Sequence, residues 1–319
     1  MLSPVGNRVT IFDLANHVSH TLPFQTNTDV DRLCLSPDGQ LLLACDVEGR
    51  GLLVNILKEV VLTHISFGGP VRDAVFSPCG KYLATAVGRL LKLWLTPTLP
   101  VEFSPLQLYR THAGPSNDIT CLSFSPDSHY VAFGSVDMSI RVVSISSQLQ
   151  RQASLLAGHR HALVGVSFVP LSPSDDVNAH ALPYALHSLA HDSVLCTWTV
   201  EAALPDDSED DEEREKEKEK EAPSKWRLSH KHYLNSPTHL GRAVGMYVAP
   251  ATHLAVVAVD TGAIALYDLW TQQQLQSLTI STAAISAVVL SPDATWIGIA
   301  AAETGSLAVW EWQSETYIL

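Results

Sequence analysis

Short apolar runs separated by turn residues recur along the chain. Val71–Phe76 alternates apolar and polar positions, and the small apolar run Tyr82–Ala86 follows it. Alternation with a period of two is typical of strands, and no helical period of useful length occurs outside one charged run. Ser77–Gly80 stands between the two runs, and its proline and glycine favour a tight turn. This part of the chain therefore predicts two antiparallel strands joined by a turn.

The turn phrase is repeated. Its clear copies begin at Ser36, Ser77, Ser125 and Ser291, and the first three are spaced by 41 and 48 residues. A second phrase ends in an aromatic residue at Trp94, Trp198, Tyr267 and Trp310. A period near 40–45 residues with four short strands in each unit is typical of WD repeats. We therefore predict an all-β fold, a seven-bladed WD-repeat β-propeller, with strands a to d in each blade counted from the channel outwards.

Residues 1–319 are expected to form this single propeller, with an incomplete first blade at 1–24. In that blade Arg8–Leu14 and Ser19–Phe24 supply strands c and d, and Met1–Val5 is what remains of strand b. We therefore expect upstream residues to be absent and an unpaired strand edge to face the channel, which is an aggregation hazard. The six further blades are expected at 29–67, 69–109, 117–156, 161–234, 239–280 and 284–319.

Blade five carries two long insertions, 171–182 and 201–224, which lengthen its a–b and c–d turns and should protrude on one face. The second contains eleven acidic and four basic residues between Asp206 and Glu221. Its composition predicts a disordered, solvated loop, and the alternative is an acidic arm for a basic partner or an ordering switch. Ser208 lies among acidic residues and is a candidate phosphosite, where phosphate would add like charge and keep the loop extended.

Composition narrows the class of protein. The net charge is −13, of which −7 lies between Asp206 and Glu221, and this argues against a uniformly basic nucleic-acid-binding surface. No run approaches the ~20 apolar residues of a membrane helix, and the first residues do not form a secretory signal. The five cysteines are widely spaced without a CxxC pair, which is typical of reduced thiols in an intracellular protein.

Blade five also carries a polar set with WD-repeat spacing: His159, Ser188, Asp192 and Trp198. We interpret it as a structural tetrad, in which a buried histidine lies between the aspartate and the serine, and the indole is tied to the same chain. A serine, a histidine and an aspartate could also suggest a hydrolase, but no GxSxG elbow is present. We expect no catalytic, cofactor or metal site, because phosphate-loop and zinc-ligand spacings are also missing.

The remaining candidates are basic residues for contacts with RNA or a partner protein. Arginines in or near the d–a and b–c turns form the first group: Arg50, Arg72, Arg89, Arg110, Arg160 and Arg242. The second group follows the acidic insertion: Lys225, Arg227 and Lys231. Interleaved basic and aromatic residues there can follow an RNA backbone and stack bases. Alternatively, the segment simply forms strand d, with Trp226, Leu228 and Tyr233 packed inside or along the rim. For each arginine the alternative is a solvated surface charge.

Several stretches resemble the periodic tryptophan protein 2 family, and together they span essentially the whole chain. They are the opening Leu2–Leu14, Gly88–Trp94 in blade three, the acidic insertion followed by Lys225-Trp226-Arg227, and the ending Val309–Leu319. The order of these features is more specific than a generic WD repeat. The resemblance is to the amino-terminal propeller of the family, whose members also have a second propeller and a helical region that this chain lacks.

The resemblance implies a non-catalytic scaffold of the nucleolus. It implies a component of the small-subunit processome, in a stable subcomplex with other processome proteins, that acts in pre-rRNA processing together with pre-rRNA and small nucleolar RNA. The resemblance implies no membrane partner and no small-molecule substrate. The alternative is a generic WD-repeat adaptor for a ubiquitin ligase or a signalling complex, since the fold alone does not determine function.

Overall fold

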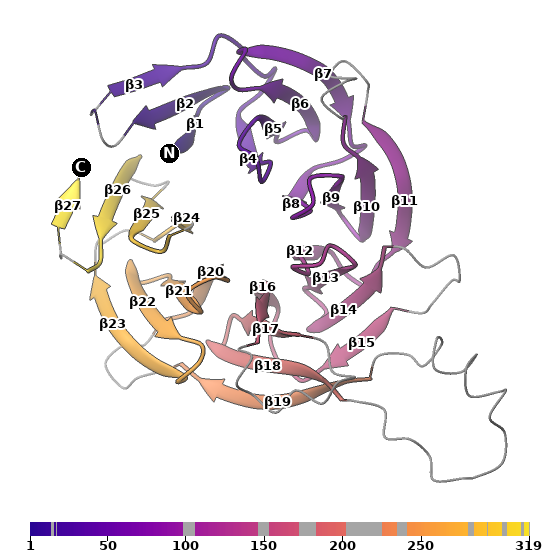
Figure 1. Ribbon diagram of the computed structural model, residues 1–319, viewed down its shortest axis with the longest axis vertical. Helices are drawn as coiled ribbons and strands as arrows, with labels where there is room; N and C mark the ends of the chain where they lie inside the picture. The colour runs from indigo at the N-terminus through magenta and orange to yellow at the C-terminus, as the bar shows by residue number, and fades with distance from the viewer. Residues whose placement is uncertain are drawn as a thin grey trace, which may run out of the picture.

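A computed structural model describes most of the chain. The described residues are 1–13, 16, 18–97, 106–145, 153–171, 183–201, 225–234, 241–279, 284–291, 293–301, 305–313 and 316–318. They form seven antiparallel sheets, arranged like the blades of a wheel around a central axis (Figure 1). The predicted all-β, seven-bladed propeller is thus confirmed.

Each sheet consists of consecutive strands, and their order in the sheet goes from the channel to the rim. Blade one contains β1 (Leu2–Val5), β2 (Arg8–Asp13) and β3 (Val18–Thr21). Blade two contains β4 (Val30–Leu35), β5 (Leu41–Asp46), β6 (Arg50–Asn55) and β7 (Val60–Ser66). Blade three contains β8 (Val71–Phe76), β9 (Tyr82–Val87), β10 (Leu90–Leu95) and β11 (Gln107–Ala113). Blade four contains β12 (Ile119–Phe124), β13 (Tyr130–Ser135), β14 (Ser139–Ser144) and β15 (Ser154–Ala157).

The last three blades follow the same order. Blade five contains β16 (Leu163–Pro170), β17 (Tyr184–Ala190), β18 (Val194–Glu201) and β19 (Lys225–Tyr233). Blade six contains β20 (Ala243–Ala249), β21 (Leu254–Val259), β22 (Ala263–Asp268) and β23 (Gln273–Thr279). Blade seven contains β24 (Ala287–Leu290), β25 (Trp296–Ala301), β26 (Ser306–Glu311) and β27 (Thr316–Ile318).

Burial explains why the apolar pattern differs between strands. Strand b is packed between two neighbouring blades, so β21 is buried at every position and its sequence is continuously apolar. The outer strand β11 contains no fully buried residue, because one of its edges and much of its surface face solvent. The core therefore lies between the blades, as a ring of apolar clusters, each shared by two neighbouring sheets.

The recurring turn phrase closes the a–b hairpins. In blade two the backbone N–H of Leu41 donates to Ser36 Oγ at 2.8 Å, and Gly39 adopts a φ of +71°. A positive φ is easy for glycine, which explains its place in the phrase. The serine and the glycine together fix the turn that was predicted from the sequence.

Blade one has three strands, as predicted, with β1 at the inner end of the order β1-β2-β3. Met1 and Phe12 exchange two backbone hydrogen bonds of 2.7 Å, which extend the pairing of β1 with β2. The side chain of Met1 lies against Gly298 in β25, so blade one also contacts blade seven.

In blade five, β18 continues to Glu201, three residues beyond Trp198, which was expected to end this strand. Residues 172–182 and 202–224 of the two expected insertions lie outside the described residues, and so does Ser208. The five cysteines are free thiols.

Candidate binding surfaces and the buried polar chain

Three members of the predicted tetrad form a buried hydrogen-bonded chain in blade five. His159 precedes β16, Ser188 lies in β17 and Trp198 in β18, so the d–a turn and two strands each contribute one group. His159 Nε2 lies 2.7 Å from Ser188 Oγ, and the indole Nε1 of Trp198 donates to the same oxygen at 2.9 Å. The chain satisfies polar groups that would otherwise be costly to bury.

Asp192, the fourth member, has a different role in the described residues. Its carboxylate accepts the backbone N–H of Val194 at 3.2 Å and so closes the b–c turn. It acts on His159 through its negative charge, which raises the histidine pKa, but burial lowers that pKa more strongly, to about 4. His159 is therefore neutral at pH 7, as its role in a buried chain requires.

This arrangement does not make a nucleophile. Ser188 is completely buried, with 0% of its surface exposed, and its oxygen already accepts the indole N–H. A substrate has no access to such an oxygen, and the neutral histidine is not held by an aspartate as in a hydrolase triad. The contacts of His159, Ser188 and Trp198 support a structural role.

The structure separates the candidate arginines into two groups. Arg50, Arg160 and Arg242 are exposed at the d–a and b–c turns. Arg50 pairs with Glu48 at 2.9 Å, and both side chains are about half exposed. Arg72 is also exposed, in the inner strand β8, and its carbonyl accepts a hydrogen bond from Arg32 Nε at 2.7 Å. These four exposed residues remain candidates for contacts with a partner.

Two other candidates are engaged in the fold or displaced from the turns. Arg89 donates from Nε to the carbonyl of Pro115 at 3.1 Å and so ties the b–c turn of blade three to blade four. Arg110 lies within the outer strand β11, with its guanidinium 5.5 Å from the centre of the Tyr109 ring. It is on the rim because β11 extends to Ala113, four residues beyond the expected end of blade three.

The basic and aromatic segment after the acidic insertion forms β19, the outer strand of blade five. Arg227 is exposed, and Tyr233 is 67% exposed with Lys231 Nζ 5.9 Å from its ring centre. Lys231 also donates to the carbonyl of Gly158 at 3.1 Å. The ring centre of Trp226 lies 6.1 Å from that of Phe168 in the inner strand β16, so Trp226 packs inwards onto the core cluster of blades four and five, while Arg227 stays exposed. Nothing is described of the side chain of Lys225.

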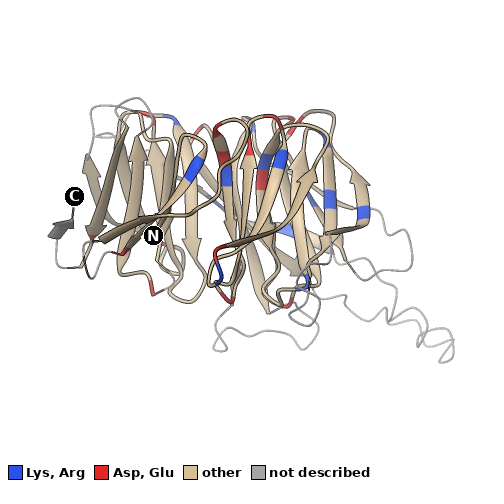
Figure 2. Cartoon of the chain, turned by 90° about the horizontal axis from the view of Figure 1, so that it is seen from above, with Lys and Arg blue, Asp and Glu red and all other residues tan. Residues whose placement is uncertain are grey.

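Charge of both signs is distributed over the wheel. Figure 2 shows acidic and basic residues interspersed along the upper edge, without a belt of one sign among the described residues.

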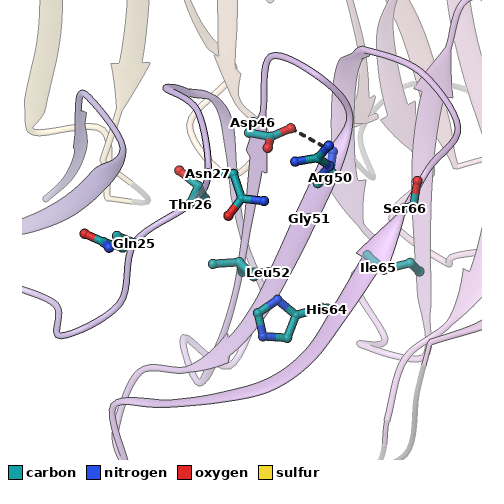
Figure 3. A pocket seen from close by; sticks show the side chains of 10 residues that line it. All are labelled: Gln25, Thr26, Asn27, Asp46, Arg50, Gly51, Leu52, His64, Ile65 and Ser66. Atoms are coloured by element: carbon teal, nitrogen blue, oxygen red, sulfur yellow. Dashed lines mark hydrogen bonds between the residues drawn. The ribbon is translucent and has the colours of Figure 1, made fainter.

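A pocket in blade two was not expected from the sequence. It has a volume of about 310 Å³ and lies between the connection from blade one and strands β6 and β7 (Figure 3). Its lining consists of Gln25, Thr26, Asn27, Asp46, Arg50, Gly51, Leu52, His64, Ile65 and Ser66. The signal for it is present in the sequence: blade two has Thr26 and Val54 where blade five has His159 and Trp198.

Two features are absent from the described residues. None of the elements that the structure describes is a helix long and apolar enough to span a membrane. Within the same residues, no group of three or more histidine, cysteine, aspartate or glutamate side chains is arranged to hold a metal ion.

Comparison with known proteins agrees with this architecture. The family model for the WD domain, G-beta repeat, matches residues 59–94 and 103–144. The whole chain is 34% identical to periodic tryptophan protein 2 of Saccharomyces cerevisiae and 31% identical to its homologue in Neurospora crassa, and it covers 34% of each relative. It is also 31% identical to the homologue in Mus musculus, of which it covers 37%. The chain thus spans about a third of the length of these relatives.

Proposed function

Since the chain belongs to the periodic tryptophan protein 2 family, we propose that it is a non-catalytic scaffold in ribosome biogenesis. The proposed role is that of a component of the small-subunit processome, located in the nucleolus, which is needed for pre-rRNA processing and small-subunit assembly. The similarity of the entire chain to relatives from fungi and mouse is the observation that carries this proposal.

The form of the molecule is consistent with such a role. A propeller offers turn faces and a rim on which several partners can dock, while its core remains a ring of packed sheets. The polar group most similar to a catalytic site, around Ser188, is buried and inaccessible. Function is therefore expected to lie in the surfaces.

We place the contact with pre-rRNA or small nucleolar RNA on β19. Arg227 and Tyr233 are exposed there, and an aromatic ring beside cationic groups can combine stacking with phosphate contact. Exposed Arg50, Arg72, Arg160 and Arg242 are proposed as contacts with processome proteins, whose carboxylates suit the planar guanidinium.

Crosslinking in cells tests the proposal. The full-length tagged protein is irradiated and purified, and the attached RNA is sequenced; pre-rRNA and small nucleolar RNA should be enriched. An Arg227→Glu variant should reduce the crosslinking yield severalfold, whereas Glu311→Gln in β26 should leave it unchanged. Recovery of ubiquitin-ligase or signalling subunits without these RNAs would replace the proposal by the adaptor alternative.

A further inference from the structure

The pocket of blade two contains a buried carboxylate that lacks one hydrogen-bond partner. Asp46 is 1% exposed, and its Oδ1 accepts the backbone N–H groups of Glu48 and Arg50 at 3.0 and 2.8 Å. Its Oδ2 is buried and accepts no hydrogen bond from the described residues. In Figure 3 this oxygen points away from the Arg50 backbone, towards the side on which Asn27 and Leu52 lie. A buried carboxylate oxygen without a donor is costly, so the site favours a group that can donate to Oδ2, a cation above all.

The same place in three other blades is filled by a basic side chain of the chain itself. Each of these side chains donates to a carbonyl of the connection that precedes strand a. The bonds are Lys92 Nζ to Phe67 at 2.6 Å, Arg141 to Gly114 at 3.0 Å and Lys231 Nζ to Gly158 at 3.1 Å. The propeller therefore repeatedly places an ammonium or guanidinium group at this position between neighbouring blades.

Blade two departs from this pattern at each relevant position. Leu52 pairs with Ala44 in the register that Lys92 has with Thr85, so an apolar side chain stands where blade three has a lysine. His64 lies opposite Leu52, where blade five has Lys231 opposite Cys196. The carbonyl of Thr26 accepts a hydrogen bond from the Asn7 amide Nδ2 at 3.3 Å, so an uncharged donor stands where other blades use a basic side chain.

Blade two lacks the ring-bearing side chains that other blades have beside this position, and their absence leaves room for the pocket. Thr26 stands four residues before strand a, where blade three has Phe67 and blade five has His159. Val54 occupies the position of Trp94 and Trp198 in strand c. The resulting volume of about 310 Å³ is within the size range of sites that bind small groups.

The Arg50 side chain of the same chain does not occupy the pocket. Its guanidinium pairs with Glu48 at 2.9 Å and is 54% exposed, so it lies at the rim. The floor is made by buried Asp46, Gly51 and Leu52, and exposed polar residues surround the mouth. A long basic side chain suits this shape, because its methylene groups can pack on Leu52 while its head reaches the carboxylate.

We propose that this pocket binds one lysine or arginine side chain presented by a partner protein. The inserted head group donates to Asp46 Oδ2 and takes the place that Lys92, Arg141 and Lys231 occupy in their own blades. The site is distinct from the proposed RNA contact on β19, and its test does not depend on that role.

Methyl-group NMR of the purified protein, with Leu52 and Ile65 as reporters, tests the site. N-acetyl-lysine methylamide and N-acetyl-arginine methylamide should shift both reporters in a saturable way, and the neutral N-acetyl-norleucine methylamide should not. Equal shifts with the norleucine probe would mean an apolar hollow without a cation site and would overturn the proposal. Binding of putrescine tenfold tighter than that of the lysine probe would overturn the assignment to a protein side chain.

Two variants of the pocket and one control variant test whether Asp46 receives the cation. Asp46→Asn should weaken binding of the lysine probe by about thirtyfold or more, because it removes the charge that receives the cation. Asp137→Asn is the matched control: it changes a carboxylate in the equivalent turn of blade four, which accepts N–H groups of Ser116 and Ser139, and should leave binding unchanged.

Leu52→Lys tests the proposal even if Asp46→Asn does not fold. It restores the lysine that blade three carries, so its own ammonium group should fill the pocket, and the Ile65 reporter should no longer respond to the probe. Probe binding by Leu52→Lys or by folded Asp46→Asn at wild-type affinity would overturn the proposal.

Discussion

Blades two and five solve the same packing problem with different chemistry. Blade five places His159, Ser188 and Trp198 in a closed polar chain between its sheet and the d–a connection. Blade two has Thr26, Ala44 and Val54 at these positions, and a pocket opens beside them. The propeller thus tolerates loss of the polar chain in one blade, because each sheet is still held by apolar clusters shared with its neighbours.

The b–c turns of the two blades differ in a related way. Ser193 in blade five has a φ of +57°, and its hydroxyl faces the carbonyl of Gly241 at 3.4 Å. Gly49 in blade two has a φ of +84°, and a Cβ there would lie 1.9 Å from the carbonyl oxygen of Gly69. The connection approaches more closely in blade two, so only glycine fits there.

The largest expected effect comes from Gly49→Ser. The left-handed backbone and the contact with Gly69 should lower the free energy of unfolding by about 3 kcal/mol or more. Urea denaturation followed by fluorescence measures this loss. The reciprocal Ser193→Gly in blade five should cost about 1 kcal/mol or less. Equal losses for both substitutions would show that the two turns do not differ as described.

Ser188→Ala should be the next most damaging change. It leaves His159 and the Trp198 indole buried without their partner, which should cost about 2–4 kcal/mol of unfolding free energy. Ala44→Ser in blade two adds a buried hydroxyl at the matching position and should also destabilise, by about 1–3 kcal/mol. If Ser188→Ala retained wild-type stability in urea, the polar chain would not stabilise blade five.

Acid should affect blade five through two buried histidines. Burial lowers the pKa of His159 and of His187 from 6.5 to about 4. Because the folded pKa is depressed, the stability is present above pH 6.5 and is lost as the pH falls towards 4, by up to about 3 kcal/mol for each histidine. Denaturation midpoints measured at several pH values follow this loss.

Asp73 titrates in the same range with the opposite sign, because burial raises the pKa of this carboxyl to about 6. The comparison is therefore made against His187→Gln, which removes one titrating histidine and can keep a hydrogen bond to Thr197. Its stability should fall less than that of the wild type between pH 6.5 and 4. If the unfolding free energies of His187→Gln and the wild type fell in parallel over this pH range, the lowered pKa of His187 would not account for the loss of stability.

Arg50→Ala should have the smallest effect. The ion pair of Arg50 with Glu48 is about half exposed, and exposed pairs contribute little. Thermal denaturation should show a change of unfolding free energy within about 0.5 kcal/mol. A larger loss would mean that Arg50 supports the b–c turn of blade two beyond this surface contact.

Repeated turn phrases and strand periods were sufficient to predict the architecture, including the three-stranded first blade. They depend on local chemistry, such as the serine and glycine of the turn at Ser36–Gly39, which is visible in a few consecutive residues. The place of Arg110 was less predictable, because it depends on how far β11 continues.

The contacts of the candidate sites depended on distances across the fold. The spacing of His159, Ser188 and Trp198 was enough to place them together, but not to show that Asp192 would bond to Val194 instead of the histidine. Predicting the pocket of blade two would have required more information: which small residues from two segments meet, the register of β5 with β6, and the position of one carboxylate oxygen.

In the proposed role this wheel is a docking scaffold within a ribosome precursor. Electron cryomicroscopy of particles purified through the tagged full-length protein tests this role. We expect a seven-bladed wheel with this sequence, whose surfaces are covered by processome proteins and RNA. Recovery of the intact protein only outside such particles, in complexes without precursor RNA, would rule this role out.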